Sequence, residues 1–291
     1  MKKTINKQKP IFGKYDLKKL PYSMPYGAPL FELKDIMHWD DSDFVIVDFM
    51  SDAKSVSEFL PKDVSLIPVP DAKGACIVKH IWADYRDSSV GPYKELIIAV
   101  PCMYKGKMWL FVPFIYVTTD SAISSGREIG GWPKKIANID MIRFGDEVLL
   151  SFERNGMELG GRCKVDQKLF STPLPPKKTI ELPFPQNVTL GIPKPTGKPQ
   201  PSILLPTLTF KWISGVGSKK PKPALAQMIG APWRLSGEFS SMKDVSVNMH
   251  PTEEDPLHKL PVLKILGATY VKGYMTLKIE EIKVLKDYLK R

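Results

Sequence analysis

Two adjacent lysines, Lys134 and Lys135, have the residue types and surroundings that could carry out chemistry. They follow a tryptophan and a proline and lie between two hydrophobic runs. An ammonium group beside another cation, or in an apolar pocket, loses its proton more readily, and the neutral amine is a nucleophile. Nucleophilic catalysis by a lysine is therefore one interpretation of this pair. The other is a solvated pair of surface charges, which is the commoner arrangement.

Two further polar residues lie within runs that have the pattern of β-strands. Glu95 precedes the apolar run 96–100, and His80 lies inside the run 77–82. In a β-rich fold both side chains could point into a cavity lined by apolar groups, where a carboxylate can accept and return protons. A glutamate that faces water and a histidine satisfied within the core are the alternatives for these two positions.

The elements that must position these residues are mostly strands. Runs of β-branched and aromatic residues, several with period-two alternation, predict strands. These runs are 43–50, 75–85, 93–103, 108–118, 139–144, 147–153, 157–165, 202–213, 244–250 and 268–279. The pair Asn155-Gly156 is typical of a two-residue hairpin turn. Many strands at short spacing favour a mainly β (α+β) fold, namely a single-domain antiparallel β-barrel or cone.

A few short helices are expected at the periphery of this barrel. Asp52 and Thr119 are suitable N-caps for helices at 53–60 and 121–129. A helical turn is expected at 224–229, and a helix at 280–289 is expected to close the chain.

The domain organisation is simple. Residues 1–24 are expected to form a basic N-terminal tail, and residues 25–291 a single domain. Nine prolines interrupt the stretch at about 166–201, which excludes a helix there but allows a short edge strand at 179–182. We expect this stretch to be a proline-rich insert that wraps over the domain.

Charge and hydropathy exclude several classes of protein. The net charge is +11, but residues 1–20 alone hold seven lysines and one aspartate, and no basic helix or RNA-binding motif is evident. We therefore expect no nucleic-acid partner; the basic field could instead attract a small anionic oxo acid. No run approaches the ~20 apolar residues of a membrane helix, and no apolar run follows the basic N-terminus as in a secretory signal. A cytoplasmic protein without a membrane partner is expected.

The cysteines and histidines argue against a metal site. Cys76, Cys102 and Cys163 lie far apart and have no Cys-x-x-Cys spacing, which also argues against a disulfide framework. The four histidines show no ligand spacing such as His-Glu-x-x-His. Neither pattern predicts a metal ligand.

Residues 126–136, Gly-Arg-Glu-Ile-Gly-Gly-Trp-Pro-Lys-Lys-Ile, resemble the Gly-Arg-Glu…aromatic-Pro-Lys-Lys signature of the acetoacetate decarboxylase family. Residues 93–101, Tyr-Lys-Glu-Leu-Ile-Ile-Ala-Val-Pro, resemble the family's strand with its active-site glutamate, and residues 255–262 resemble its C-terminal region. The resemblance covers most of residues 40–290. It implies a β-rich cone or barrel that assembles into a homo-oligomer.

The same resemblance implies a mechanism. Lys134 would form a Schiff base with the ketone of a 3-oxo acid, carbon dioxide would leave, and an enamine would remain. Acetoacetate decarboxylase is the standard example of a lysine activated by desolvation or a neighbouring cation, and here Lys135 would be that cation. Glu95 would be the pocket carboxylate that positions groups or moves a proton. No cofactor is implied, because the lysine itself is the electron sink.

This sequence departs from the family pattern at several positions that are expected to affect which substrate is bound. The family has an arginine near its N-terminal strand, whereas the first arginine here is Arg86 and the segment 27–48 offers Lys34 as its only lysine or arginine. His80 stands where the family has a second glutamate, and Trp132 replaces the usual tyrosine. A changed pocket around an unchanged lysine is typical of a different substrate or a different Schiff-base reaction.

We expect His80, Trp132 and Arg127 to contact the substrate, although Arg127 and the adjacent glutamate could also form an exposed or locally paired couple. The favoured function is a Schiff-base-forming decarboxylase that converts acetoacetate or a related 3-oxo acid to a ketone and carbon dioxide. One alternative is a lysine-dependent aldolase, dehydratase or hydratase that acts on an oxo acid in the same fold. A non-enzymatic barrel-type binder of a small ligand is the other.

Overall fold

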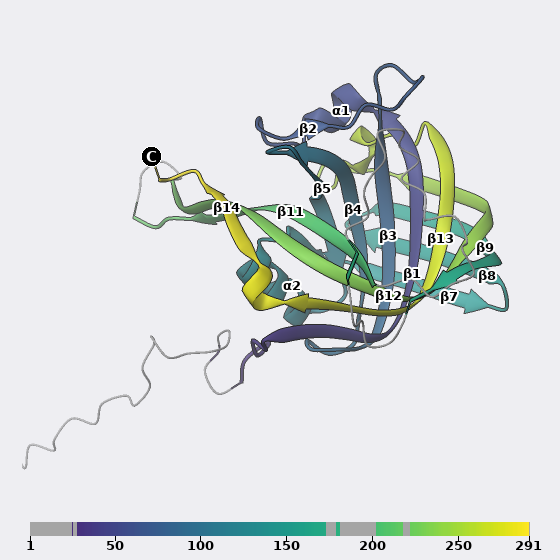
Figure 1. Ribbon diagram of the computed structural model, residues 1–291, viewed down its shortest axis with the longest axis horizontal. Helices are drawn as coiled ribbons and strands as arrows, with labels where there is room; N and C mark the ends of the chain where they lie inside the picture. Colours follow the sequence, from purple (N-terminus) through teal and green to yellow (C-terminus); the bar gives the residue numbers. More distant parts are fainter. Residues whose placement is uncertain (1–24, 26–27, 173–178, 181–201, 218–221, 291) are drawn as a thin grey trace, which may run out of the picture.

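The computed structural model describes residues 25, 28–172, 179–180, 202–217 and 222–290 (Figure 1). The strands are β1 (Ile36–Asp52), β2 (Ser65–Leu66), β3 (Ala75–Ser88), β4 (Tyr93–Tyr104), β5 (Lys107–Val117), β6 (Lys134–Ile136), β7 (Asn138–Phe144), β8 (Glu147–Arg154), β9 (Met157–Ser171), β10 (Thr179–Ile180), β11 (Ser202–Ser214), β12 (Pro223–His250), β13 (Lys264–Lys278) and β14 (Lys283–Asp287). The helical segments are short: α1 (Ala53–Ser57), α2 (Asp120–Ser125), the π-helical turn η2 (Gly126–Gly130), and the 3-10 turns η3 (Leu257–Lys259) and η4 (Ile279–Glu281). None of the described helices is long and apolar enough to cross a membrane.

The strands form one sheet that closes into a ring. Its order is β11–β5–β4–β3–β1–β13–β12, and β12 pairs again with β11. Most neighbours are antiparallel, but β11 runs parallel to β5 over Thr207 and Leu208, and that short contact completes the ring. The predicted mainly β fold is confirmed, with a mixed sheet in place of a purely antiparallel one.

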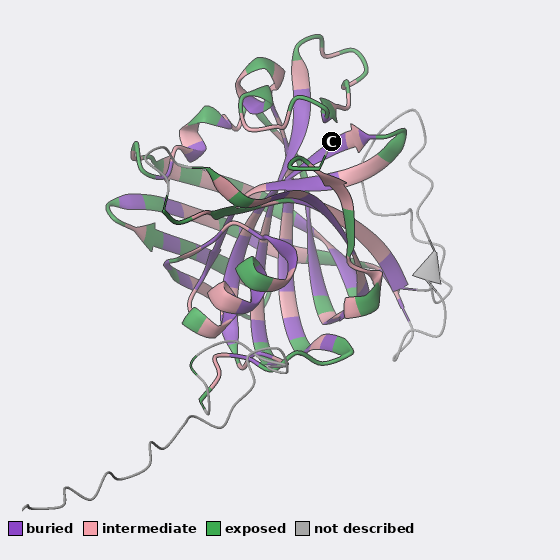
Figure 2. Cartoon of the chain, turned by 90° about the vertical axis from the view of Figure 1, so that its left-hand side faces the viewer, coloured by how far each residue is buried: buried purple, intermediate pink, exposed green. Residues whose placement is uncertain are grey.

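Strands β7, β8 and β9 continue the sheet beyond β12 and lie beside the ring (Figure 1). The turn between β8 and β9 has positive φ at both Asn155 (48°) and Gly156 (81°), as a two-residue hairpin turn requires. The hairpin that this pair predicts is therefore confirmed. Figure 2 shows buried and exposed residues alternating along many of the strands, as expected for a pleated sheet with one face covered.

Alternation along the ring strands creates two separate cores. One set of side chains, which includes Phe44 and Tyr85, points into the ring and packs with residues of β12 and β13. The other set, which includes Phe49 and Trp82, points outward and packs against β7, β8 and β9. A residue and its neighbour on these strands therefore belong to different environments.

Two helix predictions were wrong. Residues 224–229, expected to be a helical turn, lie within β12, where they pair with β11. Residues 280–289, expected to be a closing helix, form η4 and then β14, which pairs with β12 over Gln227–Gly230. Helix-forming residues occupy both segments, Ala and Leu in the first and Glu, Leu and Lys in the second, but pairing with a neighbouring strand outweighed this weak preference.

Other expectations were only partly met or fall outside the described ranges. The helix predicted at 53–60 ends at Ser57, and the one predicted at 121–129 changes to a π-helical turn after Ser125. Within the proline-rich stretch, β9 continues to Ser171, and Thr179–Ile180 form β10 within the range 179–182 where the sequence allowed an edge strand. The basic tail at 1–24 and most of the proline-rich insert lie outside the described residues.

Candidate active site

Lys134 lies at the start of β6, which pairs with β5 in parallel so that Lys134 is opposite Ile115. Because successive side chains of a strand point to opposite faces, Lys134 points into the ring and Lys135 points out of it. The Lys134 side chain is 8% exposed, and its Nζ lies 2.7 Å from Glu95 Oε1. The structure thus brings the two residues together as a buried ion pair.

The glycine-rich sequence before the lysines makes room for the Lys134 side chain. A Cβ atom added at Gly126 would lie 2.5 Å from Lys134 Cδ and 2.6 Å from its Cε, far inside van der Waals contact. At the end of η2, Gly131 has a φ of 68° and backs onto Lys211, whose Cβ would be 2.5 Å from an added Cβ. Glycine at 126 leaves space for the present position of the Lys134 side chain, and glycine at 131 allows both the close approach of Lys211 and the left-handed backbone.

Aromatic residues hold Glu95 and surround the ammonium group. The Tyr85 hydroxyl donates a hydrogen bond to Glu95 Oε2 at 3.0 Å. The Lys134 ammonium lies 5.2 Å from the centre of the Tyr93 ring, and the Tyr93 hydroxyl accepts a hydrogen bond from Trp39 Nε1 at 2.8 Å. Burial raises the pKa of both tyrosines well above the ordinary value, so both phenols stay protonated and Tyr85 remains a donor.

Lys134, Glu95 and Tyr85 line a cavity of about 460 Å³ inside the ring. This volume is typical of a small-molecule site. Neighbouring strands contribute a row of isoleucines to its wall, and aromatic residues contribute three indole rings; these residues are Ile46, Ile81, Ile97, Ile115, Trp39, Trp132 and Trp233. A ligand bound here would lose most of its contact with water, which strengthens every electrostatic interaction inside.

A second ion pair, not predicted from the sequence, lies in the wall of the same cavity. Lys79 of β3 contacts Asp48 of β1, directly opposite it in the sheet, and both residues line the cavity. Burial raises the pKa of Asp48, although the Lys79 charge opposes that shift. The sequence did contain a signal for this pair, namely one charged residue inside each of two strand-like runs. Asp48 lies between Val47 and Phe49, and Lys79 lies between Val78 and His80.

Lys135 occupies a different environment from its neighbour. Its Nζ lies 2.6 Å from Asp255 Oδ1, and the fully buried Asp255 also accepts hydrogen bonds from Tyr116 at 2.9 Å and Arg154 at 3.0 Å. These contacts attach β6 to the segment before η3. The expected side-by-side arrangement of two ammonium groups is therefore absent here, because strand alternation and Asp255 direct Lys135 away from Lys134.

Of the three residues expected to contact a substrate, one lines the cavity and two do not. Trp132 does. His80 is 1% exposed and packs against Phe49, 4.6 Å away, in the core outside the ring. Burial lowers the pKa of His80 to about 3, so the ring is neutral. Placing His80 in the pocket was wrong, because Lys79 and not His80 points inward.

Arg127 also lies away from the cavity. It is exposed on η2, and its Nη1 donates a long hydrogen bond of 3.5 Å to the backbone oxygen of Lys134. The prediction that it contacts substrate does not agree with this placement. The structure instead agrees with the alternative, in which Arg127 is exposed and bonded to a nearby part of the chain.

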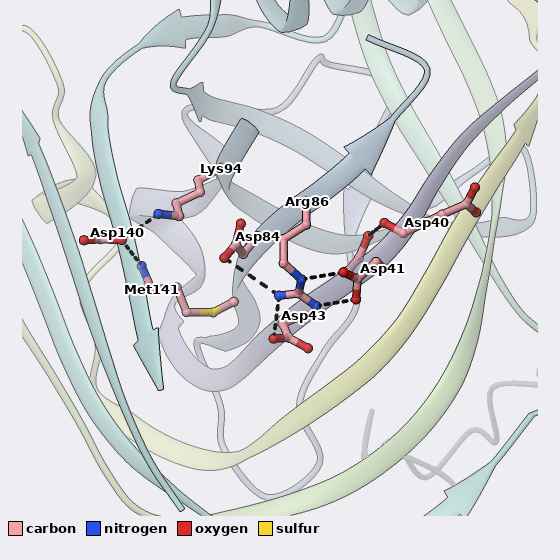
Figure 3. A network of polar contacts seen from close by, with 9 residues as sticks. Asp40, Asp41, Asp43, Asp84, Arg86, Lys94, Asp140 and Met141 are labelled. Atoms are coloured by element: carbon pink, nitrogen blue, oxygen red, sulfur yellow. Dashed lines mark hydrogen bonds and ion pairs between the residues drawn. The ribbon is translucent and has the colours of Figure 1, made fainter. Parts of the chain in front are cut away.

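Arg86, the first arginine of the chain, does not take the place of the family's N-terminal arginine. It follows Tyr85 on β3 and therefore points to the outer face, where it contacts Asp41 at 2.8 Å and Asp43 at 2.9 Å (Figure 3). The same network includes Asp84, while Lys94 pairs with Asp140 beside it (Figure 3). Within the part of the chain that the structure describes, no arginine lines the cavity.

The described residues include no group of three or more His, Cys, Asp or Glu side chains that could hold a metal ion. Cys76, Cys102 and Cys163 are free thiols and buried. Burial raises the pKa of Cys76 and of Cys102 to about 12. These two thiols stay protonated and unreactive at neutral pH.

Known proteins share the fold of this chain. Acetoacetate decarboxylase 3 of Mesorhizobium japonicum is 25% identical over 274 residues, which cover 93% of each chain. The crystal structure of acetoacetate decarboxylase from Legionella pneumophila superposes with a TM-score of 0.66 at 21% identity and covers 97% of this chain and 100% of that one. The enduracididine biosynthesis enzyme MppR, solved in complex with pyruvate, superposes with a TM-score of 0.62 at 15% identity, covering 92% and 98%. The sequence model of the family described as acetoacetate decarboxylase (ADC) matches residues 20–289, and the chain therefore belongs to the acetoacetate decarboxylase family.

Proposed function

We propose that the protein is a Schiff-base-forming enzyme that acts on a 3-oxo acid through Lys134 and releases carbon dioxide. The observation that carries the proposal is the buried Lys134 ammonium, 2.7 Å from Glu95 Oε1 in the wall of an apolar cavity. A lysine amine in an apolar site is an activated nucleophile, and an adjacent carboxylate can take up its proton. Membership of a family with relatives named acetoacetate decarboxylase supports this choice.

The reaction begins when Glu95 accepts a proton from Lys134 and the neutral amine attacks the ketone carbon of the substrate. Loss of water leaves a protonated imine. The bond between the carboxylate carbon and C2 then breaks, carbon dioxide departs, and the electron pair moves through C2 and C3 to the imine nitrogen. Protonation of the resulting enamine at C2 and addition of water to the imine release the ketone and restore Lys134.

Two other residues help to hold Glu95 and Lys134 in place. Tyr85 is a positioning residue, because its hydroxyl donates to Glu95 Oε2 and leaves the other carboxylate oxygen to Lys134. Lys135 is a positioning residue for β6 through its contact with Asp255. In this proposal the apolar wall, and not a second ammonium, activates the nucleophile.

Borohydride trapping tests the proposal directly. The protein is incubated with acetoacetate, a longer 3-oxo acid or pyruvate, sodium borohydride is added, and intact mass and the modified peptide are measured together with carbon dioxide. We expect a covalent adduct on Lys134 and release of carbon dioxide from a 3-oxo acid. A folded sample that forms no adduct with any of the oxo acids would contradict the proposal.

A second candidate is an aldol, dehydration or hydration reaction of an oxo acid through the same lysine. It is favoured by the cavity wall, in which the described residues place no arginine to bind a carboxylate, and by the fold shared with MppR, solved with pyruvate. An adduct on Lys134 that forms without carbon dioxide release would select this candidate.

Replacing Gly126 with alanine is expected to lower kcat/KM by about 10- to 100-fold, since small displacements of a reacting group have effects of this size. The added Cβ would overlap Lys134 Cδ and Cε, so the flexible lysine side chain must move away from Glu95. Stability should also fall, because moving the Lys134 ammonium weakens its buried ion pair with Glu95; the backbone itself adds little cost, since Gly126 has a helical φ of −63° that alanine adopts readily. Steady-state kinetics and thermal unfolding measure the two effects separately.

Gly267→Ala is the matched control, because an added Cβ at this exposed strand position meets no atom within 4 Å. Activity of this variant should equal that of the wild type. Wild-type activity in Gly126→Ala would show that Lys134 does not need the space beside the π-helical turn.

A further inference from the structure

The ion pair between Asp48 and Lys79 has no part in the chemistry at Lys134, yet it faces the same cavity. Its side chains are 16% and 11% exposed, and the two residues lie directly opposite each other on β1 and β3. Two further strands carry the reacting pair, Glu95 on β4 and Lys134 on β6. One cavity therefore contains two lysine–carboxylate pairs.

The two pairs lie far apart along the wall. Lys79 is opposite Ala99 in the sheet, and Ala99 is four residues from Glu95 along β4. At ~3.3 Å per residue, this separation is about 13 Å along the strand. The cavity wall between the two positions is formed by Ile81 and Ile97, which are also opposite each other. The cavity thus carries charged pairs at two separate places, with isoleucines between them.

Stability of the fold does not account for the second pair. Taking two charges out of water costs free energy that their attraction rarely exceeds, and apolar residues of similar volume are often as stable or more so. Within the described part of the chain, Lys79 Nζ makes one hydrogen bond, to Asp48, although an ammonium group has three donors. The remaining donors are available to a molecule in the cavity.

We infer that Asp48 and Lys79 form a binding site for the distal end of an extended substrate whose reacting end lies at Lys134. The inference rests on the proposed function, and it names the substrate class. That class is a 3-oxo acid with a chain long enough to follow the isoleucines and with a neutral hydrogen-bonding group, such as a hydroxyl or carbonyl, at its far end. The Lys79 ammonium donates a hydrogen bond to this group. Where the group is a hydroxyl, its proton is donated to the Asp48 carboxylate.

Charge and volume select this class over a short acid. Each pair already balances its own charge, so a second carboxylate at the far end would compete with Asp48 for Lys79. Acetoacetate would leave most of the roughly 460 Å³ cavity to water. Each buried methylene of a longer chain should raise kcat/KM about fourfold, and the distal hydrogen bond should add about 10- to 100-fold.

The test compares 3-oxo acids of increasing chain length, each with and without a terminal hydroxyl, in the wild-type protein and in the double variant Asp48→Leu/Lys79→Met. Removing both charges together avoids leaving one buried charge without its partner. We expect the wild type to prefer the terminal hydroxyl by about 10- to 100-fold in kcat/KM at the chain length that spans the two pairs. The double variant should prefer the chain without it. The double variant Asp166→Leu/Lys243→Met, which removes an exposed pair of the same type, should keep the wild-type preference.

Binding of the saturated acids, which lack the ketone, separates the two proposals. Calorimetry of these acids with and without the terminal hydroxyl should show the same preference, and the same loss in Asp48→Leu/Lys79→Met. If borohydride traps no adduct but this preference holds, the proposed reaction is wrong and the distal site stands. Equal affinity for both acids in the wild type, or a preference that the variant retains, would overturn the distal site.

Discussion

Replacing Lys134 with methionine is expected to remove the borohydride-dependent adduct and to reduce turnover by a factor on the order of 10⁴ or more. No other group in the proposed mechanism can form the imine, so the electron pair released with carbon dioxide would have no acceptor. Methionine has a similar length and no charge, so it should fill the space beside Gly126. Turnover and adduct mass with a reactive 3-oxo acid measure the effect.

The loss must be separated from unfolding. Removing one partner of a buried ion pair costs about 3–5 kcal/mol, because the other charge remains buried. The double variant Lys134→Met/Glu95→Gln carries no such charge and should melt closer to the wild type while also forming no adduct. Thermal unfolding of both variants shows whether the inactive protein is folded.

Lys135→Met is the matched control, since it changes the adjacent lysine on the other face of β6. Its ammonium contacts Asp255 outside the cavity, so we expect the adduct to form on Lys134 and the melting temperature to fall slightly. An adduct that persists in Lys134→Met, or that disappears only in Lys135→Met, would show that the nucleophile has been assigned to the wrong residue.

Replacing Glu95 with glutamine is expected to lower kcat by about 10²- to 10⁴-fold, the usual effect of a general acid–base group. The amide keeps the shape of the carboxylate and can still accept the hydrogen bond from Tyr85, but it cannot take a proton from Lys134. The effect should fall on kcat more than on KM, because Glu95 acts on protons and Lys134 holds the substrate. Steady-state kinetics and trapping measure these separately.

Glu128→Gln tests whether any glutamate near the lysine segment would have the same effect. Glu128 is exposed on η2 and accepts a hydrogen bond from Ser124 at 2.8 Å. We expect wild-type kcat in this variant. If Glu95→Gln retains full kcat while Glu128→Gln does not, the carboxylate beside Lys134 is not the group that moves the proton.

Local sequence was sufficient for the fold class, and the family resemblance added the proposed reacting pair. Period-two alternation predicts strands because a pleated chain sends alternate side chains to opposite faces, and turns such as Asn155-Gly156 adopt positive φ from their own residue types. Gly126 packs against Lys134 and Gly131 packs against Lys211, so the residues just before the lysines carry part of the signal of the site. Lys134 and Glu95 were predicted from the resemblance of residues 126–136 and 93–101 to the family's motifs, because the residues alone left a surface charge pair and a water-facing glutamate open.

Segments whose preference is weak were decided by their neighbours in space. Residues 224–229 contain helix formers but lie in β12, where they pair with β11, and residues 283–287 form β14, which pairs with β12 over Gln227–Gly230. A difference in helix propensity of a few tenths of a kcal/mol per residue is smaller than the gain from a paired and buried strand.

The sequence by itself predicted a mainly β fold and, through its resemblance to the acetoacetate decarboxylase family, pointed to Lys134 and Glu95, the two residues that we propose as the reacting groups. Only the tertiary structure decided which member of each adjacent pair faces the cavity: Lys134 and not Lys135, Lys79 and not His80. Alternation defines two faces, but the closure of the ring decides which of them is inside. The pair formed by Asp48 and Lys79 depends on β1 and β3 lying in register across 31 residues of chain, and no local pattern encodes that register.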